Sequence, residues 1–168
     1  GVVVGLLSVY FTKSYIRITA IFEKFESPWK RLLVAGGLLG VIILIFPPLY
    51  GEGYEGVNQE LRGEFYHLFE NSIFEGWHQS FALLVVYMLL VIGLKVVATT
   101  LTFSAGGIGG IFAPTLFMGA NSGLLFGLVL NQLGVDVSVS TMALVGMAGM
   151  IAGVVHAPLT AIFLIAEI

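Results

Sequence analysis

Apolar residues gather in five long stretches of the chain, separated by short polar or glycine-rich segments. The stretches cover roughly residues 1–22, 32–49, 79–103, 111–135 and 139–168. A straight helix needs about 20 apolar residues to cross the hydrocarbon core of a bilayer. No stretch shows the alternation of apolar and polar residues that marks a half-buried strand. The pattern therefore predicts an all-α, polytopic integral membrane protein.

Three of these stretches are too short or too interrupted to form a straight span. The second ends at Pro47 and Pro48, the fourth begins beside a glycine cluster, and the fifth is broken at His156-Ala157-Pro158. Unpaired peptide groups in lipid cost several kcal/mol each, so irregular backbone at membrane depth survives only where protein buries it or water lines it. We therefore expect tilted and broken helices, with each break a candidate wall of a cavity.

Composition supports a bilayer as the solvent. Of 168 residues, 58% are hydrophobic and 10% charged, and the mean hydropathy is +1.01, which lies far from the values of soluble domains. Cysteine is absent, which excludes disulfides and thiolate chemistry. The net charge of −3 and the lack of a basic run exclude nucleic acid as a partner. The lipid bilayer is the expected surrounding.

Charged residues predict the orientation of the first two connections. Cations gather near the first connection, which we expect to be cytoplasmic: Lys13, Arg17, Lys24, Lys30 and Arg31, against Glu23 and Glu26. The connection at about 50–78 holds six glutamates and a single arginine, and we expect it to face outward. Its polar run around 60–70 suits a short surface helix.

Small residues recur at helical spacing, which lets helices approach closely in a membrane. The rows are Thr115, Gly119, Gly123 and Gly127, then Gly36 and Gly40, then Gly146, Gly149 and Gly153. We interpret them as helix-packing surfaces without a ligand.

The segment 104–116 carries the most chemical information. Four glycines within 106–110 cannot continue a helix cheaply, and Pro114 favours the first turn of a new helix. A helix start leaves its first N–H groups without intrahelical partners and carries about half a positive charge. The amides of Gly110, Ile111, Phe112 and Ala113 are therefore candidate donors to an anion.

Other interpretations of this segment and of the chain stay open on composition alone. The glycines suit a flexible kink whose amides bond to neighbouring carbonyls. A nucleotide-binding loop is disfavoured, because the third glycine position is missing and the segment follows a helix. A membrane-embedded enzyme is disfavoured, because the apolar stretches contain neither paired carboxylates nor a serine–histidine constellation. A structural scaffold accounts for the small-residue rows but not for the glycine break before Pro114.

Two long motifs resemble a known family of membrane proteins. Residues 106–120 read GGIGGIFAPTLFMGA, which looks like the glycine-rich turn followed by G-x-F-A-P of the CLC chloride channels and chloride/proton antiporters. Residues 146–162 read GMAGMIAGVVHAPLTAI, which resembles the later G-x-x-A-P-L-T-x-I segment of the same family. Both motifs occur in the family's order and spacing.

This resemblance implies a fold and a function. The chain is similar to most of the second of two inverted repeats, so we expect 1–168 to be part of one CLC transmembrane domain, truncated at both ends. The amides of Ile111 and Phe112 would coordinate chloride, with Gly110 and Ala113 contributing less. The expected partners are chloride, the missing remainder of the protein and a second copy in a homodimer that uses segments around 139–168. A bacterial inner membrane is the expected location.

Several residues invite functional assignments that we do not make. Glu167 matches an acidic position at a helix end of the family and suggests a structural role. We expect Lys95 to pair with a carbonyl or an acid, or to snorkel toward the cytoplasm, rather than to bind chloride directly. His67, His78 and His156 match no metal-ligand spacing. No cofactor is expected beyond chloride as the transported ligand, and no enzymatic activity.

Overall fold

The computed structural model describes residues 1–51, 53, 57, 59, 72, 74 and 80–167. The described residues form helices joined by short connections, as the sequence predicts. Six α-helices are described in this part of the chain: α1 (Val2–Glu23), α2 (Pro28–Ile45), α4 (Phe81–Ser104), α5 (Phe112–Gln132), α6 (Val139–Val154) and α7 (Pro158–Ala166), with a short 3₁₀ helix, η1 (Pro47–Leu49), after α2. The surface helix expected around 60–70 lies outside the described residues.

Four of these helices are long and apolar enough to cross a membrane: α1, α2, α4 and α5. Both predicted interruptions of the later stretches are confirmed, since α4 and α5 are separate helices and the last stretch divides into α6 and α7. Proline accounts for three boundaries. Pro28 and Pro158 stand at the first position of α2 and α7, where a missing N–H costs nothing, and Pro47 follows the end of α2.

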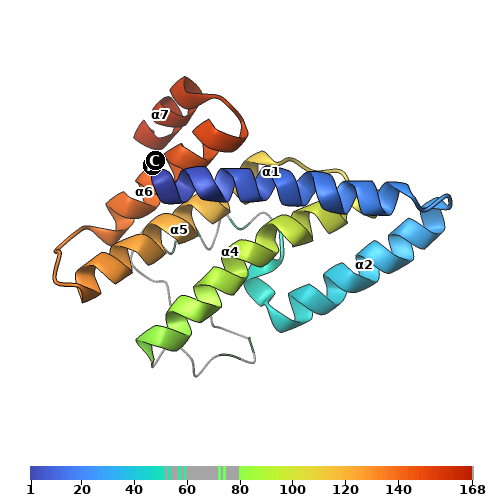
Figure 1. Ribbon diagram of the computed structural model, residues 1–168, viewed down its shortest axis with the longest axis horizontal. Helices are drawn as coiled ribbons and strands as arrows, with labels where there is room; N and C mark the ends of the chain where they lie inside the picture. The colour runs from blue at the N-terminus through green and yellow to red at the C-terminus, as the bar shows by residue number, and fades with distance from the viewer. Residues whose placement is uncertain are drawn as a thin grey trace.

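The helices α5 and α6 make the most extensive contact between any two elements of the described structure. They run side by side in Figure 1, where α1 lies across α6 and α4 flanks α5. Most of α5 is buried, from Pro114 to Leu125, whereas α2 buries only Ala35 within the described structure. Helix α5 is thus the element most firmly held by its neighbours.

Glycines set the distance between α5 and α6. A Cβ atom at Gly119 would lie 2.6 Å from the Cα atom of Met147, and one at Gly123 would overlap the carbonyl of Met142. Gly146 faces the backbone of α5 in the same way. The predicted packing role of these two rows is confirmed here, because the two backbones touch where side chains would otherwise separate them.

The rest of the small-residue prediction has a mixed outcome. Gly149 and Gly153 face Val4 and Ser8 of α1 across short distances, so their row also serves a second helix. Apart from the backbone of α2 itself and the adjacent residues in sequence, no described atom lies within 4 Å of a Cβ atom placed at Gly36 or Gly40. Their packing role therefore stays a prediction.

Replacing Gly123 by alanine should destabilise the full-length protein in detergent. The added methyl group meets backbone atoms that cannot rotate away, so the expected cost is about 3 kcal/mol, at the upper end for overpacking. Thermal unfolding of the purified protein measures it. Gly127→Ala, in the same row, is the matched control: its Cβ would lie 3.2 Å from the Cα atom of Val139, so a smaller loss is expected. Equal stability of both variants would contradict the packing argument.

Candidate anion site

Helix α4 ends before α5 in a hydrogen-bonded turn rather than in a flexible kink. Gly106 has a φ of +93°, a left-handed conformation that costs other residues about 1–2 kcal/mol. The N–H of Gly106 donates to the carbonyl of Phe103, and that of Gly107 donates to the carbonyl of Thr102. This pair of bonds is a Schellman motif, which closes the end of α4 by pairing two of its last carbonyls.

The chain then returns into a new helix within a few residues. Ile111 caps α5 with φ −80° and ψ −12°, and Phe112 is the first helical residue. The N–H of Thr115 donates to the carbonyl of Ile111 at 3.1 Å, which starts the helical bonding pattern. The predicted new helix with Pro114 in its first turn is confirmed.

The first amides of α5 are unpaired in the described structure. No backbone hydrogen bond there uses the N–H of Gly110, Ile111, Phe112 or Ala113. The alternative in which neighbouring carbonyls satisfy these donors is therefore not what the described residues show. These four consecutive N–H groups lie at the positive end of the α5 dipole.

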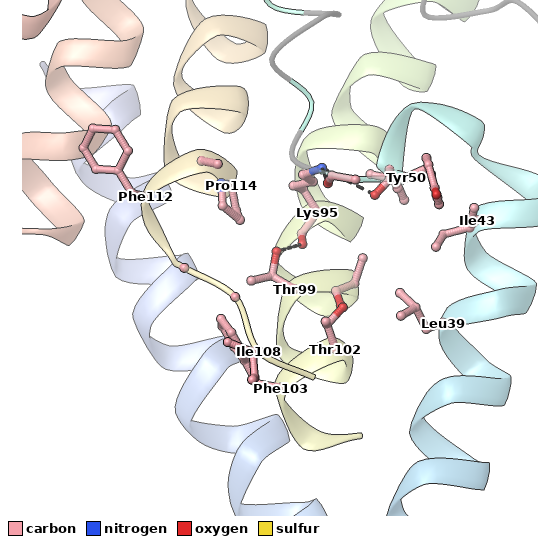
Figure 2. Close-up of a pocket in the computed structure, with 16 residues that line it drawn as sticks. Leu39, Ile43, Tyr50, Lys95, Thr99, Thr102, Phe103, Ile108, Phe112 and Pro114 are labelled. Atoms are coloured by element: carbon pink, nitrogen blue, oxygen red, sulfur yellow. Dashed lines mark hydrogen bonds between the residues drawn. The ribbon is translucent and has the colours of Figure 1, made fainter. Parts of the chain in front are cut away.

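A cavity of about 480 Å³ lies beside this terminus, between α2, α4 and the 108–114 segment (Figure 2). Gly110, Phe112 and Ala113 line it. Ile111, which is 37% exposed, is not among its lining residues. Three of the four predicted site residues thus face a common space.

The opposite wall of the cavity comes largely from α4. Lys95, Thr99 and Thr102 line it, and Figure 2 shows them one above another along the helix. The hydroxyl of Thr99 donates to the carbonyl of Lys95 at 2.8 Å, and that of Thr102 donates to the carbonyl of Ala98 at 2.9 Å. Their hydroxyl hydrogens are therefore used within the helix, and this wall presents oxygen lone pairs instead.

Lys95 pairs with backbone carbonyls, one of the expectations from sequence. Its Nζ donates to the carbonyl of Gly51 at 3.0 Å and to that of Leu49 at 3.4 Å. The side chain is only 1% exposed, which excludes snorkelling to an aqueous surface within the described structure. Lys95 therefore ties the end of η1 and the residues after it to α4 at the edge of the cavity.

Sequence reasoning missed this polar wall, although a signal was present. Lys95, Thr99 and Thr102 stand four and three residues apart in an otherwise apolar stretch, which places them on one face of a helix. A polar stripe on a membrane helix indicates a face turned toward protein or water. The contribution of Leu49 to Gly51 had no comparable signal.

The whole chain, residues 1–168, matches the family model described as voltage gated chloride channel. The chain belongs to this CLC family. The family consists of channels and transporters rather than enzymes, so the enzyme alternative is set aside. The resemblance of the two glycine- and proline-containing motifs is thereby confirmed, together with the CLC membrane fold.

Individual relatives give the same assignment. The chain is 33% identical over 171 residues to a ClcB-like protein of Ralstonia nicotianae, and 30% identical over 176 residues to the H(+)/Cl(-) exchange transporter ClcA of Yersinia pestis. It is 31% identical over 174 residues to ClcA of Salmonella paratyphi B. Each alignment covers 99% of this chain but only 33–35% of the relative. The search of solved structures found no significant match.

Replacing Gly106 by alanine should lower the stability of the full-length protein by about 1–2 kcal/mol. An L-residue strains the left-handed backbone that closes α4, although the space around the added methyl group is open. Thermal unfolding checks this. Gly37→Ala is the control, because Gly37 also has open space around it but lies within α2, where alanine is the better helix former. A Gly106→Ala variant as stable as the wild type would show that this turn does not need glycine.

Proposed function

We propose that the full-length protein transports chloride across a membrane, as a channel or as a proton-coupled exchanger, and that the N-terminus of α5 holds the anion. The unpaired N–H groups of Gly110, Ile111, Phe112 and Ala113 carry the proposal. In this assignment Ile111 and Phe112 are the main donors. The ClcA relatives are named H(+)/Cl(-) exchange transporters, which supports the choice of anion.

The physical logic is the replacement of water by backbone donors. A halide entering a membrane loses hydration, and amide dipoles at a helix start supply hydrogen bonds and a partial positive charge in return. These groups carry no full charge, so they hold the anion without trapping it, as conduction requires. No covalent step is involved.

Location and assembly belong to the same proposal. The chain is an integral membrane protein by its family and its spans, and its bacterial relatives support a bacterial inner membrane. We also propose that it forms part of one CLC transmembrane domain, completed by the rest of the protein, within a homodimer. Leu159, Ile162 and Phe163 of α7 are exposed, which supports an interface near 139–168. A monomeric mass of the solubilised full-length protein would contradict the dimer.

Removing the N–H of Phe112 should weaken halide binding by about tenfold to a hundredfold, since one hydrogen bond to a charged group contributes about 1.5–3 kcal/mol. Proline is unsuitable for this test, because Ile111 has an α-region conformation that a following proline disfavours. A backbone ester at position 112, introduced as the α-hydroxy acid, replaces the N–H by oxygen and keeps the side chain. Calorimetry with chloride and chloride efflux from liposomes measure the effect.

A matched control is a backbone ester at Leu159. Its N–H lies in the first turn of another helix start, α7, and forms no backbone hydrogen bond among the described residues. The ester there should leave chloride binding and efflux unchanged. Unaltered binding after the change at Phe112 would remove that amide from the site. A wild-type protein with no flux above empty vesicles would defeat chloride transport itself.

A further inference from the structure

We propose that Lys95 is a fixed positive charge that sets the anion affinity of the cavity without contacting the anion. The inference rests on the proposed chloride transport and adds a residue that neither glycine-rich motif contains. It is drawn from three observations: the contacts of the Lys95 ammonium group, the absence of a paired carboxylate among the described residues, and the position of Lys95 in the cavity wall.

Two hydrogen-bond donors of Lys95 are already engaged. An ammonium group has three N–H donors and no acceptor. Two point to the carbonyls of Gly51 and Leu49, and the ring of Phe117 lies 4.4 Å from Nζ, within the range of a cation–π interaction. Figure 2 shows the amine turned toward the carbonyls on either side of Tyr50. Two of the three donors are thus committed to backbone carbonyls, and these bonds hold the ammonium group at the edge of the cavity rather than at the α5 terminus.

The positive charge of Lys95 is not needed to form these two hydrogen bonds. A neutral amide could donate to the same two carbonyls, whereas burying an ammonium group costs several kcal/mol unless an opposite charge is near. No carboxylate in the described part of the chain forms an ion pair with Lys95. Carbonyl dipoles and an aromatic face offset only part of this cost. A buried charge kept without a described counter-ion in a membrane helix points to a role for the charge.

The cavity is where that charge acts. Lys95 is the one charged residue among the described residues that line it, and the wall opposite contains Gly110, Phe112 and Ala113. Electrostatic attraction declines slowly across a low-dielectric space. On the α4 wall, the hydroxyl hydrogens of Thr99 and Thr102 are used within the helix, so Lys95 supplies the attraction from this side. Its field adds to that of the α5 dipole.

Because the Lys95 ammonium group does not contact the anion, it attracts the anion without binding it too tightly for release. A free ammonium group in a dry cavity would bind a halide as an ion pair, and conduction requires binding weak enough to permit release. The carbonyls of Leu49 and Gly51 fix the ammonium group at the edge of the cavity. The anion thus experiences the field of a full charge but bonds only to backbone amides.

Three substitutions in the purified full-length protein separate charge from contact. Lys95→Gln removes the charge and keeps a donor, Lys95→Met removes both, and Lys95→Arg keeps the charge. Calorimetry should show chloride binding weakened about tenfold by glutamine and by methionine, and within about twofold of the wild type for arginine. Chloride efflux from liposomes should fall with the same two neutral variants.

The matched control is Thr100→Val, which alters α4 beside the cavity without changing charge. Thr100 does not line the cavity, and its hydroxyl donates to the carbonyl of Val96 within the helix, so chloride affinity should stay unchanged. Thermal unfolding verifies that each variant is folded. If Lys95→Gln does not fold, the chloride affinity of Lys95→Met tests the role of the charge. Wild-type affinity in either folded neutral variant would overturn the proposal. So would a changed order of preference among chloride, bromide and iodide in Lys95→Arg, because that would show direct contact. Absent flux in the wild type would instead refute the proposed function.

Discussion

Peptide N–H groups in a membrane must be hydrogen bonded, and this constraint underlies the candidate site. A continuous helix satisfies it automatically. The glycine segment after Ser104 interrupts the helix, and the interruption leaves the amides of residues 110–113 without backbone partners in the described structure. A ligand that accepts hydrogen bonds and carries negative charge is the natural complement of such a terminus. In the proposed function, the hydrogen bonds to the anion therefore come from the main chain, and the proposed field of Lys95 adds to them without contact.

The packing of α5 makes this geometry stable. Gly119, Gly123 and Gly146 bring the backbones of α5 and α6 into direct contact, while α4 ends in a hydrogen-bonded turn at Gly106 and Gly107. Both helices bordering the break are thus fixed independently of the anion. Under the proposed function, a terminus held in this way would not have to reorganise to bind an anion, which is what fast exchange between site and solution requires.

Sequence patterns predicted the parts of the fold that depend on local chemistry. The glycines at 106–110, Pro114 and Pro158 mark helix boundaries because backbone freedom and a missing N–H act within a few residues. The wall formed by Leu49 to Gly51 was not predictable in this way, because Lys95 meets those carbonyls across 46 and 44 residues of chain. Sequence placed Lys95 in a helix with a carbonyl among its possible partners. It did not indicate which carbonyls, or that their segment borders the same cavity as Phe112.

The most direct measurement is the anomalous-scattering map of crystals of the full-length protein soaked in bromide, which replaces chloride and scatters anomalously. The account predicts a bromide peak within hydrogen-bonding distance of the amide nitrogens of Ile111 and Phe112, at the mouth of α5 and out of contact with Nζ of Lys95. The account would be contradicted by a map that shows bromide bound elsewhere in the protein but none at this position. It would also be contradicted by a structure in which carbonyl oxygens accept hydrogen bonds from those two nitrogens.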